Sequence, residues 1–262
     1  MTQRERREFL IRYLLQEKPE YKDIELPCSD DEQKCLFRSL VNVRLPLPAS
    51  DEFLKIQDEY LAEENRSRGI TNLTDLEAVA DREDLYLWRG DITTLKIDAI
   101  VNAANSGMTG CWHPNHSCID NCIHTFAGIQ LRAVCADIMQ KQGHEEPTGQ
   151  AKITPAFNLP SKYVIHTVGP IAGEKLTQAD CDLLASCYKS CLDIAKKNGC
   201  ASIAFCCIST GVFRFPADRA AEIAVATVRE WKNQTGNKMK VVFNVFSQKD
   251  ESIYRGGLYE RD

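Results

Sequence analysis

The chain has 262 residues, of which 44% are hydrophobic and 26% are charged. This length and composition fit one large globular domain or two smaller ones and exclude fibrous and fully disordered classes. The formal net charge is -5, and neither a long basic run nor an apolar run near the roughly 18 residues of a membrane span is present. We therefore expect a cytoplasmic protein with no nucleic-acid and no membrane partner.

The first 80 residues carry apolar side chains at helical spacing. Helices are predicted over residues 5–17 and 50–64 from this spacing. Between them, Ser29 and Glu32 form the sequence pattern of a capping box, and Pro46 and Pro48 end the helix that it begins. Residues 1–80 are therefore predicted to form a helical amino-terminal extension, with a boundary near Ala80.

From residue 85 onward, short apolar runs alternate with longer amphipathic stretches. The runs are typical of strands buried on both faces and lie at 85–88, 97–103, 163–168, 202–208 and 240–246. Helices are predicted over 119–142, 177–198 and 217–233, and Gly143, Gly199 and Gly236 are placed to end them in the left-handed conformation. Buried strands joined by helices predict an α/β domain over residues 81–262, with helices on each side of a sheet.

Three polar or glycine-containing segments follow predicted strands, at residues 90–93, 102–107 and 209–213. Ligands gather at the carboxyl ends of strands in open α/β sheets, although each segment alone is also compatible with a plain turn. The small residues of 209–213 would let main-chain amides approach a diphosphate. No Lys follows Gly211, so this segment is not a Walker sequence and ATP-dependent phosphoryl transfer is not supported.

Several of the 12 cysteines lie in apolar runs, where buried free thiols explain them. The segment 110–124 differs, because cysteines and histidines crowd a polar stretch that is typical of a zinc site rather than of a core. We predict Cys111, His116 and Cys118 as the zinc ligands, with His113 and Cys122 as rival ligands. The competing interpretation is that these are buried thiols and a solvated histidine. Asp120 lies beside the predicted metal and could take a proton, fix a ribose hydroxyl or cap the following helix.

Four segments together resemble the macrodomain family in order and spacing. They are Gly90-Asp91-Ile92-Thr93, Val101-Asn102-Ala103-Ala104-Asn105, Ile165-His166-Thr167-Val168-Gly169-Pro170 and Ile208-Ser209-Thr210-Gly211-Val212-Phe213. The segment Cys111 to His124 stands where ordinary macrodomains have a glycine-rich loop, and it is similar to that of the zinc-dependent subclass, whose members also carry a helical amino-terminal extension. The resemblance implies a three-layer α/β/α macrodomain with a mixed sheet that binds ADP-ribose.

The resemblance also implies a role for each site residue. Asp91 would accept the adenine amino group with Ile92 beside it, and Asn105 would hold the distal ribose. Cys111, His116 and Cys118 would ligate Zn²⁺. Ile119 and Asp120 would line the distal ribose, and Cys118 is counted with them among the ligand-binding residues. The diphosphate and ribose would be wrapped by Ser209, Thr210, Gly211, Val212 and Phe213, and Asn244 to Phe246 would add an aromatic wall near the adenine.

The activity implied by the subclass is zinc-dependent removal of mono-ADP-ribose from modified proteins, with an Asp or Glu ester as the expected linkage. Asp120 would be the proton-accepting or orienting residue and Asn105 would align the sugar, which makes these two the predicted catalytic residues. A sirtuin-type ADP-ribosyltransferase is the implied partner enzyme.

Two departures from the family pattern keep alternatives open. Many relatives have glycine where this chain has Arg214, and zinc-type members often have an acidic residue at the position of Val212. A non-catalytic reader of ADP-ribosylated proteins and an O-acetyl-ADP-ribose deacetylase are therefore the competing functions.

Overall fold

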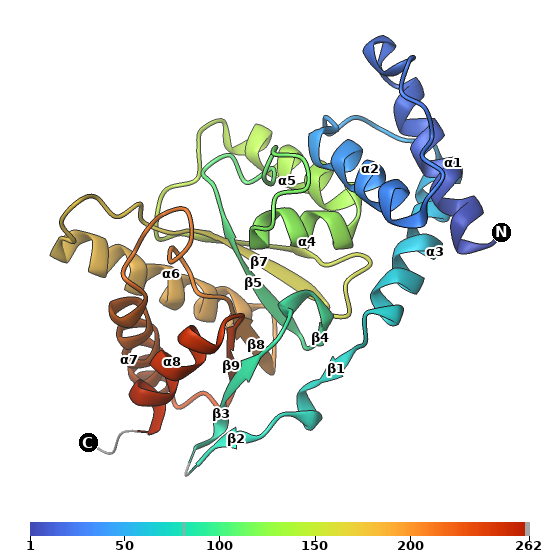
Figure 1. Cartoon of the computed structure of the whole chain (residues 1–262). Helices are drawn as coiled ribbons and strands as arrows, with labels where there is room; N and C mark the ends of the chain where they lie inside the picture. Colours follow the sequence, from blue (N-terminus) through green and yellow to red (C-terminus); the bar gives the residue numbers. More distant parts are fainter. Residues whose placement is uncertain (81, 260–262) are drawn as a thin grey trace.

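A computed structural model of the protein describes residues 1–80 and 82–259 (Figure 1). The α-helices are α1 Gln3–Gln16, α2 Asp30–Val43, α3 Asp51–Ser67, α4 Ile119–Ala127, α5 Ile129–Gln142, α6 Gln178–Lys197, α7 Ala217–Thr235 and α8 Gln248–Tyr259. The strands are β1 Thr71–Asn72, β2 Ala78–Val79, β3 Arg82–Arg89, β4 Leu95–Lys96, β5 Ala99–Ala104, β6 Ala151–Pro155, β7 Tyr163–Val168, β8 Ser202–Phe205 and β9 Lys240–Val245. Short 3₁₀ turns lie at η1 Pro19–Tyr21, η2 Leu73–Asp75 and η3 Ile92–Thr94.

The main sheet has seven strands in the order β2-β3-β9-β8-β5-β7-β6. The five central strands run parallel, whereas β2 and β6 at the two edges pair antiparallel with β3 and β7. The central strands are buried on both faces, which explains why their sequences read as continuous apolar runs. The predicted mixed sheet is confirmed.

Helices cover both faces of this sheet (Figure 1). The connection from β5 to β7 carries α4 and α5, and the connections from β7 to β8 and from β8 to β9 carry α6 and α7. The first connection crosses the sheet in the opposite direction to the other two, so right-handed crossovers place α4 and α5 on one face and α6 and α7 on the other. α8 packs beside α7, and the predicted three-layer α/β/α architecture is confirmed.

The amino-terminal helices α1, α2 and α3 form a separate helical unit beside α4, as the sequence predicts (Figure 1). Its apolar residues, including Leu10, Phe37 and Phe53, form a hydrophobic cluster of their own, which the sheet domain joins through Ile129. The predicted division between residues 80 and 81 stays a prediction, because residue 81 lies outside the described residues. Residues 260–262, at the end of the predicted second domain, lie outside them as well.

The predicted helix over 119–142 is wrong in one respect, because Gly128 divides it into α4 and α5. Gly128 has φ +99°, and there the Gln57 side chain of α3 accepts a hydrogen bond from Ile129 N at 3.0 Å. The predicted strand over 202–208 ends at Phe205, since residues 206–208 already belong to the loop that follows. The sequence pattern also missed β6, an edge strand that holds Lys152 and Pro155.

The predicted helix ends are confirmed in their conformation. Gly143 and Gly236 are the left-handed caps of α5 and α7, and Gly199 follows the cap of α6 with φ +69°.

Across the described ranges 1–80 and 82–259, the structure contains no helix that is long and apolar enough to cross a membrane.

Candidate active site

Polar and aromatic residues predicted from the sequence gather at one edge of the sheet. Asp91 follows β3, Asn105 follows β5, Ser209 follows β8 and Phe246 follows β9. These strands are parallel, so their carboxyl ends meet at a common edge. The segments predicted to bind a ligand are therefore neighbours in space.

Asp91 lies where β3 enters a 3₁₀ turn, and its carboxylate has several donors. Oδ1 accepts hydrogen bonds from Thr93 N at 2.9 Å and from Thr93 Oγ1 at 2.6 Å, and Oδ2 pairs with the Arg68 guanidinium from the end of α3. The same guanidinium stacks on Phe126, with 3.5 Å to the ring centroid. Ile92, the next residue, is buried.

The loop after β8 offers free main-chain donors. Among the residues that the structure describes, the amides of Gly211, Val212 and Phe213 donate to no other group, and consecutive free amides of this kind bind anions. Ser209 has φ +65°, and its buried Oγ lies 2.0 Å from where a Cβ on Gly169 would be. Only glycine at position 169 allows the two loops to approach this closely.

Arg214 and Val212, the two departures from the family pattern, lie at this edge of the sheet. Arg214 has φ +57°, a left-handed conformation that glycine adopts without strain, so the glycine that the resemblance leads us to expect here would fit the backbone. The Val212 side chain is 73% exposed and the Phe246 side chain 81% exposed. Both are large apolar groups open to a bound molecule at this edge.

Asp120 is buried at the start of α4 and belongs to a polar network. Asn102 Nδ2 donates to Asp120 Oδ1 at 2.8 Å, and Asn105 Nδ2 lies 3.4 Å from Asp120 Oδ2. Burial raises the pKa of Asp120 to about 6, with the hydrogen bond from Asn102 acting in the opposite direction. A carboxyl group with a pKa near neutrality is suited to accept a proton during a reaction.

Behind Asp120 lie two buried histidines that the sequence analysis did not assign to the site. His166 Nδ1 is 3.1 Å from Asn102 Nδ2, and His166 Nε2 is 3.0 Å from Thr154 Oγ1. Since Asn102 Nδ2 can only donate, His166 carries its proton on Nε2. Burial lowers the pKa of His166 to about 3 and that of His124 well below its usual range, so both rings are neutral.

Two groups of side chains could hold a metal ion within the described part of the chain. One is Cys111, His116 and Cys118, which are partly exposed, and the other is the buried group His124, Cys135 and His166. In each group the ligand atoms lie within 4.8 Å of one another. In the second group, His166 already makes hydrogen bonds through both nitrogens, which leaves the first group better suited to a metal.

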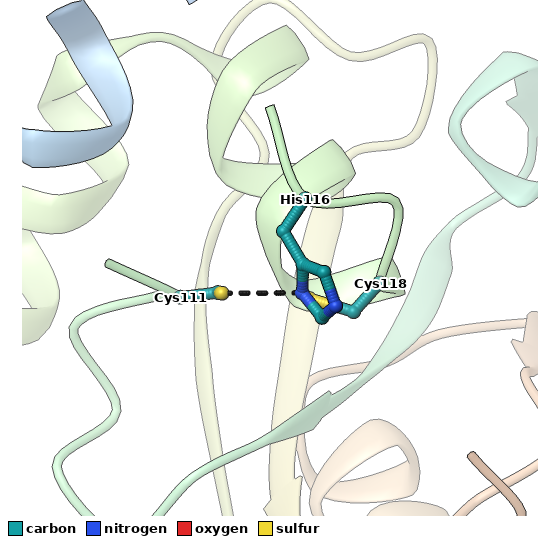
Figure 2. Close-up of side chains that lie close together, drawn as sticks. All are labelled: Cys111, His116 and Cys118. Atoms are coloured by element: carbon teal, nitrogen blue, oxygen red, sulfur yellow. Dashed lines mark hydrogen bonds between the residues drawn. The ribbon is translucent and has the colours of Figure 1, made fainter. Parts of the chain in front are cut away.

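Figure 2 shows Cys111, His116 and Cys118 pointing toward one another from the loop that precedes α4. Cys111 Sγ is 3.4 Å from His116 Nδ1, and Cys118 is the residue that caps α4, with its Sγ 3.4 Å from Asn121 N. Burial raises the pKa of the Cys118 thiol to about 12, so a thiolate here requires a cation beside it. Two thiols and one imidazole are a donor set that Zn²⁺ accepts with one position left open.

The two rival ligands lie outside this group. His113 is exposed, and its ring centroid lies 5.9 Å from that of His116. Cys122 Sγ lies 3.5 Å from Nη2 of Arg38, a residue of α2. The structure therefore brings together the three residues that the sequence analysis ranked first.

Comparisons with known proteins show the family of this chain. The sequence model of the macro domain family matches residues 101–224. A protein from Treponema medium described as "Protein-ADP-ribose hydrolase" is 68% identical over 256 residues, which cover 97% of this chain and 98% of that protein. The chain belongs to the macro domain family. A protein of the same description from Staphylococcus aureus (strain MRSA252) is 51% identical over 251 residues, covering 95% of this chain and 94% of that protein.

A solved structure supports the macro domain fold. The Trypanosoma brucei macrodomain in complex with ADP-ribose superposes with a TM-score of 0.63 at 32% identity, and the match covers 83% of this chain and 93% of that chain. The resemblance drawn from the sequence motifs is thereby confirmed at the level of the family and the fold.

Several residues of this macro domain that contact the site were missed by the sequence analysis. Arg38, Asn42 and Arg68 come from the helical extension and reach residues 23 to 84 positions later in the chain. No local pattern links residues so far apart, and a charged or amide side chain on an amphipathic helix reads as its solvated face. For Asn102, the position inside a buried strand was a signal, because a buried polar side chain needs a partner.

Proposed function

We propose that this macro domain protein is a zinc-dependent protein-ADP-ribose hydrolase that removes mono-ADP-ribose from modified Asp or Glu side chains. The observation that carries the proposal is the convergence of Cys111, His116 and Cys118 at the ligand-facing edge of the sheet. Cys118, the last of the three, lies two residues before Asp120. Hydrolysis of the ester adds water and yields free ADP-ribose and the unmodified carboxylate of the target protein.

The loops at this edge would bind the two ends of ADP-ribose separately. Asp91 retains an acceptor position on its carboxylate for the adenine amino group, and the exposed ring of Phe246 would stack near the adenine. The free amides of Gly211 to Phe213 would bind the diphosphate. The distal ribose would then lie toward Asn105 and Asp120, next to the predicted metal ligands.

Asp120 would accept the proton from the attacking group, and Asn105 would orient the ribose toward it. Asn102 keeps the Asp120 carboxylate in place by donating to Oδ1 at 2.8 Å. Zinc held by Cys111, His116 and Cys118 would supply Lewis acidity toward a hydroxyl or water at the distal ribose. The two thiolates would neutralise the charge of the ion, which makes it a milder Lewis acid than a three-histidine site.

The substrate of this reaction is a protein that already carries ADP-ribose, so an ADP-ribosyltransferase must supply it. The resemblance assigns that partner enzyme to the sirtuin type. The target protein would contact the exposed rim that includes Val212, whose side chain faces away from the core.

Replacing one cysteine in each candidate metal group tests the metal assignment. Cys118→Ser is expected to remove zinc and to lower ADP-ribose release at least about 100-fold, because a thiolate ligand is lost while serine still caps α4. Cys135→Ser is the matched control from the buried group and is expected to keep about one zinc per chain and most of its turnover. Zinc content and release of ADP-ribose from a mono-ADP-ribosylated protein are measured on the same preparations.

If Cys118→Ser kept its zinc and its turnover while Cys135→Ser lost both, the metal would belong to the buried group and the assignment would be overturned. Full zinc content and tight ADP-ribose binding without turnover would instead make the protein a reader, the alternative that Val212 favours. Comparing turnover on the modified protein and on O-acetyl-ADP-ribose separates the hydrolase from the deacetylase.

A further inference from the structure

The loop from Cys111 to Cys118 has little structure of its own. In the part of the chain that the structure describes, one main-chain hydrogen bond has both partners within this loop, from His116 N to His113 O at 3.3 Å. Residues 112–115 are exposed, and Asn115 has φ +55°. Such a loop does not fix the position of three ligand atoms by itself, so contacts from outside must do so.

Two side chains of α2 supply contacts to the main chain of the loop. Arg38 Nη2 donates to His116 O at 2.7 Å, and Asn42 Oδ1 accepts a hydrogen bond from Asn115 N at 3.0 Å. Arg38 and Asn42 are four residues apart and therefore lie on one face of α2. Together they fix the main chain at Asn115 and His116. This segment holds His116 Nδ1 at 3.4 Å from Cys111 Sγ.

The same two side chains connect the loop to α4. Arg38 Nη2 also donates to Asn121 Oδ1 at 2.9 Å, and Asn121 Nδ2 donates to His113 O at 2.9 Å. Asn42 Nδ2 donates to Thr125 Oγ1 at 3.0 Å. Asn42 and Asn121 are 1% and 0% exposed, so these bonds are shielded from water and are costly to break.

We propose that Arg38 and Asn42 are positioning residues of the metal-binding loop, so that the helical extension is a working part of the active site. This inference rests on the proposed zinc site. Groups that orient metal ligands contribute to metal affinity without touching the metal, and their loss typically costs about 10-fold to 100-fold in affinity. Arg38 and Asn42 orient the main chain that carries His116, one of the three proposed ligands.

Zinc affinity of the full chain tests the inference. In competition with a chromogenic chelator, Arg38→Met and Asn42→Ala are each expected to bind zinc about 10-fold to 100-fold more weakly than the wild type. Arg38→Lys keeps the charge but lacks the planar guanidinium, which contacts Asn121 Oδ1 through both Nε at 3.2 Å and Nη2 at 2.9 Å. Its loss of zinc affinity should therefore be intermediate. Lys34→Met is the matched control, because Lys34 lies one turn earlier on α2 and pairs with Glu64 at 3.1 Å, away from the loop.

A second measurement needs no zinc. In the chelated proteins, the amides of Asn115 and His116, which donate to Asn42 Oδ1 and His113 O, should exchange with solvent at least about 10-fold faster in Arg38→Met than in the wild type or in Lys34→Met. Unchanged exchange together with wild-type zinc affinity in Arg38→Met overturns the inference. Zinc that stays bound in Cys118→Ser contradicts the proposed metal site instead, and faster exchange in Arg38→Met would then still support the positioning role.

Discussion

Replacing Asp120 with Asn is expected to lower the turnover of a mono-ADP-ribosylated protein at least about 100-fold, the loss typical of removing a general base. The amide of Asn can still accept the hydrogen bond that Asn102 Nδ2 donates to Asp120 Oδ1 at 2.8 Å, so the local packing should persist. What the variant lacks is a carboxylate that can take a proton. Release of ADP-ribose under multiple-turnover conditions is the measurement.

Two further measurements on Asp120→Asn separate a catalytic role from a structural one. Calorimetry should give an ADP-ribose affinity within about 5-fold of the wild type, since the adenine and diphosphate contacts lie in other loops. Asp137→Asn, the same substitution at an exposed position of α5, is the control and should leave turnover unchanged. Turnover of Asp120→Asn within about 3-fold of the wild type would exclude Asp120 as the base.

Much of the sheet domain could be predicted because its sequence signals are local. The central strands are buried on both faces and therefore appear as short apolar runs, and Gly143 and Gly236 mark helix ends through their left-handed conformation. The edge strand β6 could not be found in this way, because burial no longer dictates its residues. The break at Gly128 was also missed, since a single glycine inside an apolar helical pattern does not by itself end a helix.

In the candidate site too, groupings of residues close together in the sequence could be predicted, whereas contacts between distant residues could not. Cys111, His116 and Cys118 lie within eight residues, so their spacing alone suggested that they converge. The contacts that hold this loop come from Arg38 and Asn42, more than 70 positions earlier, and the tertiary fold alone brings them there. Asn102 was visible as part of a polar segment after a predicted strand and His166 only as part of a family motif, whereas the structure gives both a physical role in fixing Asp120.

The two buried histidines behind Asp120 are expected to make the protein sensitive to acid, and the contribution of His166 can be tested separately because a His166 variant retains His124. His166 is fully buried, and burial lowers its pKa from 6.5 to about 3. Above pH 6.5 the ring is neutral in both the folded and the unfolded chain, so it adds no pH dependence. Below that pH the unfolded chain binds a proton that the folded protein does not bind. The free energy of unfolding therefore falls by up to about 1.4 kcal/mol per pH unit until the pH reaches the folded pKa.

Urea unfolding of the wild type and of His166→Gln at several pH values tests this expectation. At pH 7 the variant should be the less stable of the two, because it disturbs the bonds to Asn102 and Thr154. Between pH 7 and pH 5 the gap should narrow by about 2 kcal/mol, since the wild type alone loses the contribution of the neutral imidazole. His144→Gln, at an exposed position, should leave the pH dependence as it is in the wild type.

Asp120 changes the free energy of unfolding with pH in the opposite direction to His166, but it does not affect the comparison of the wild type with His166→Gln. Because burial raises its pKa from 3.8 to about 6, the folded protein binds a proton more readily than the unfolded chain, and this stabilises the fold as the pH falls through that range. Asp120 is present in both the wild type and His166→Gln, so its contribution cancels in the difference. A gap between the two proteins that stays constant from pH 7 to pH 5 would mean that His166 titrates alike in the folded and unfolded chains.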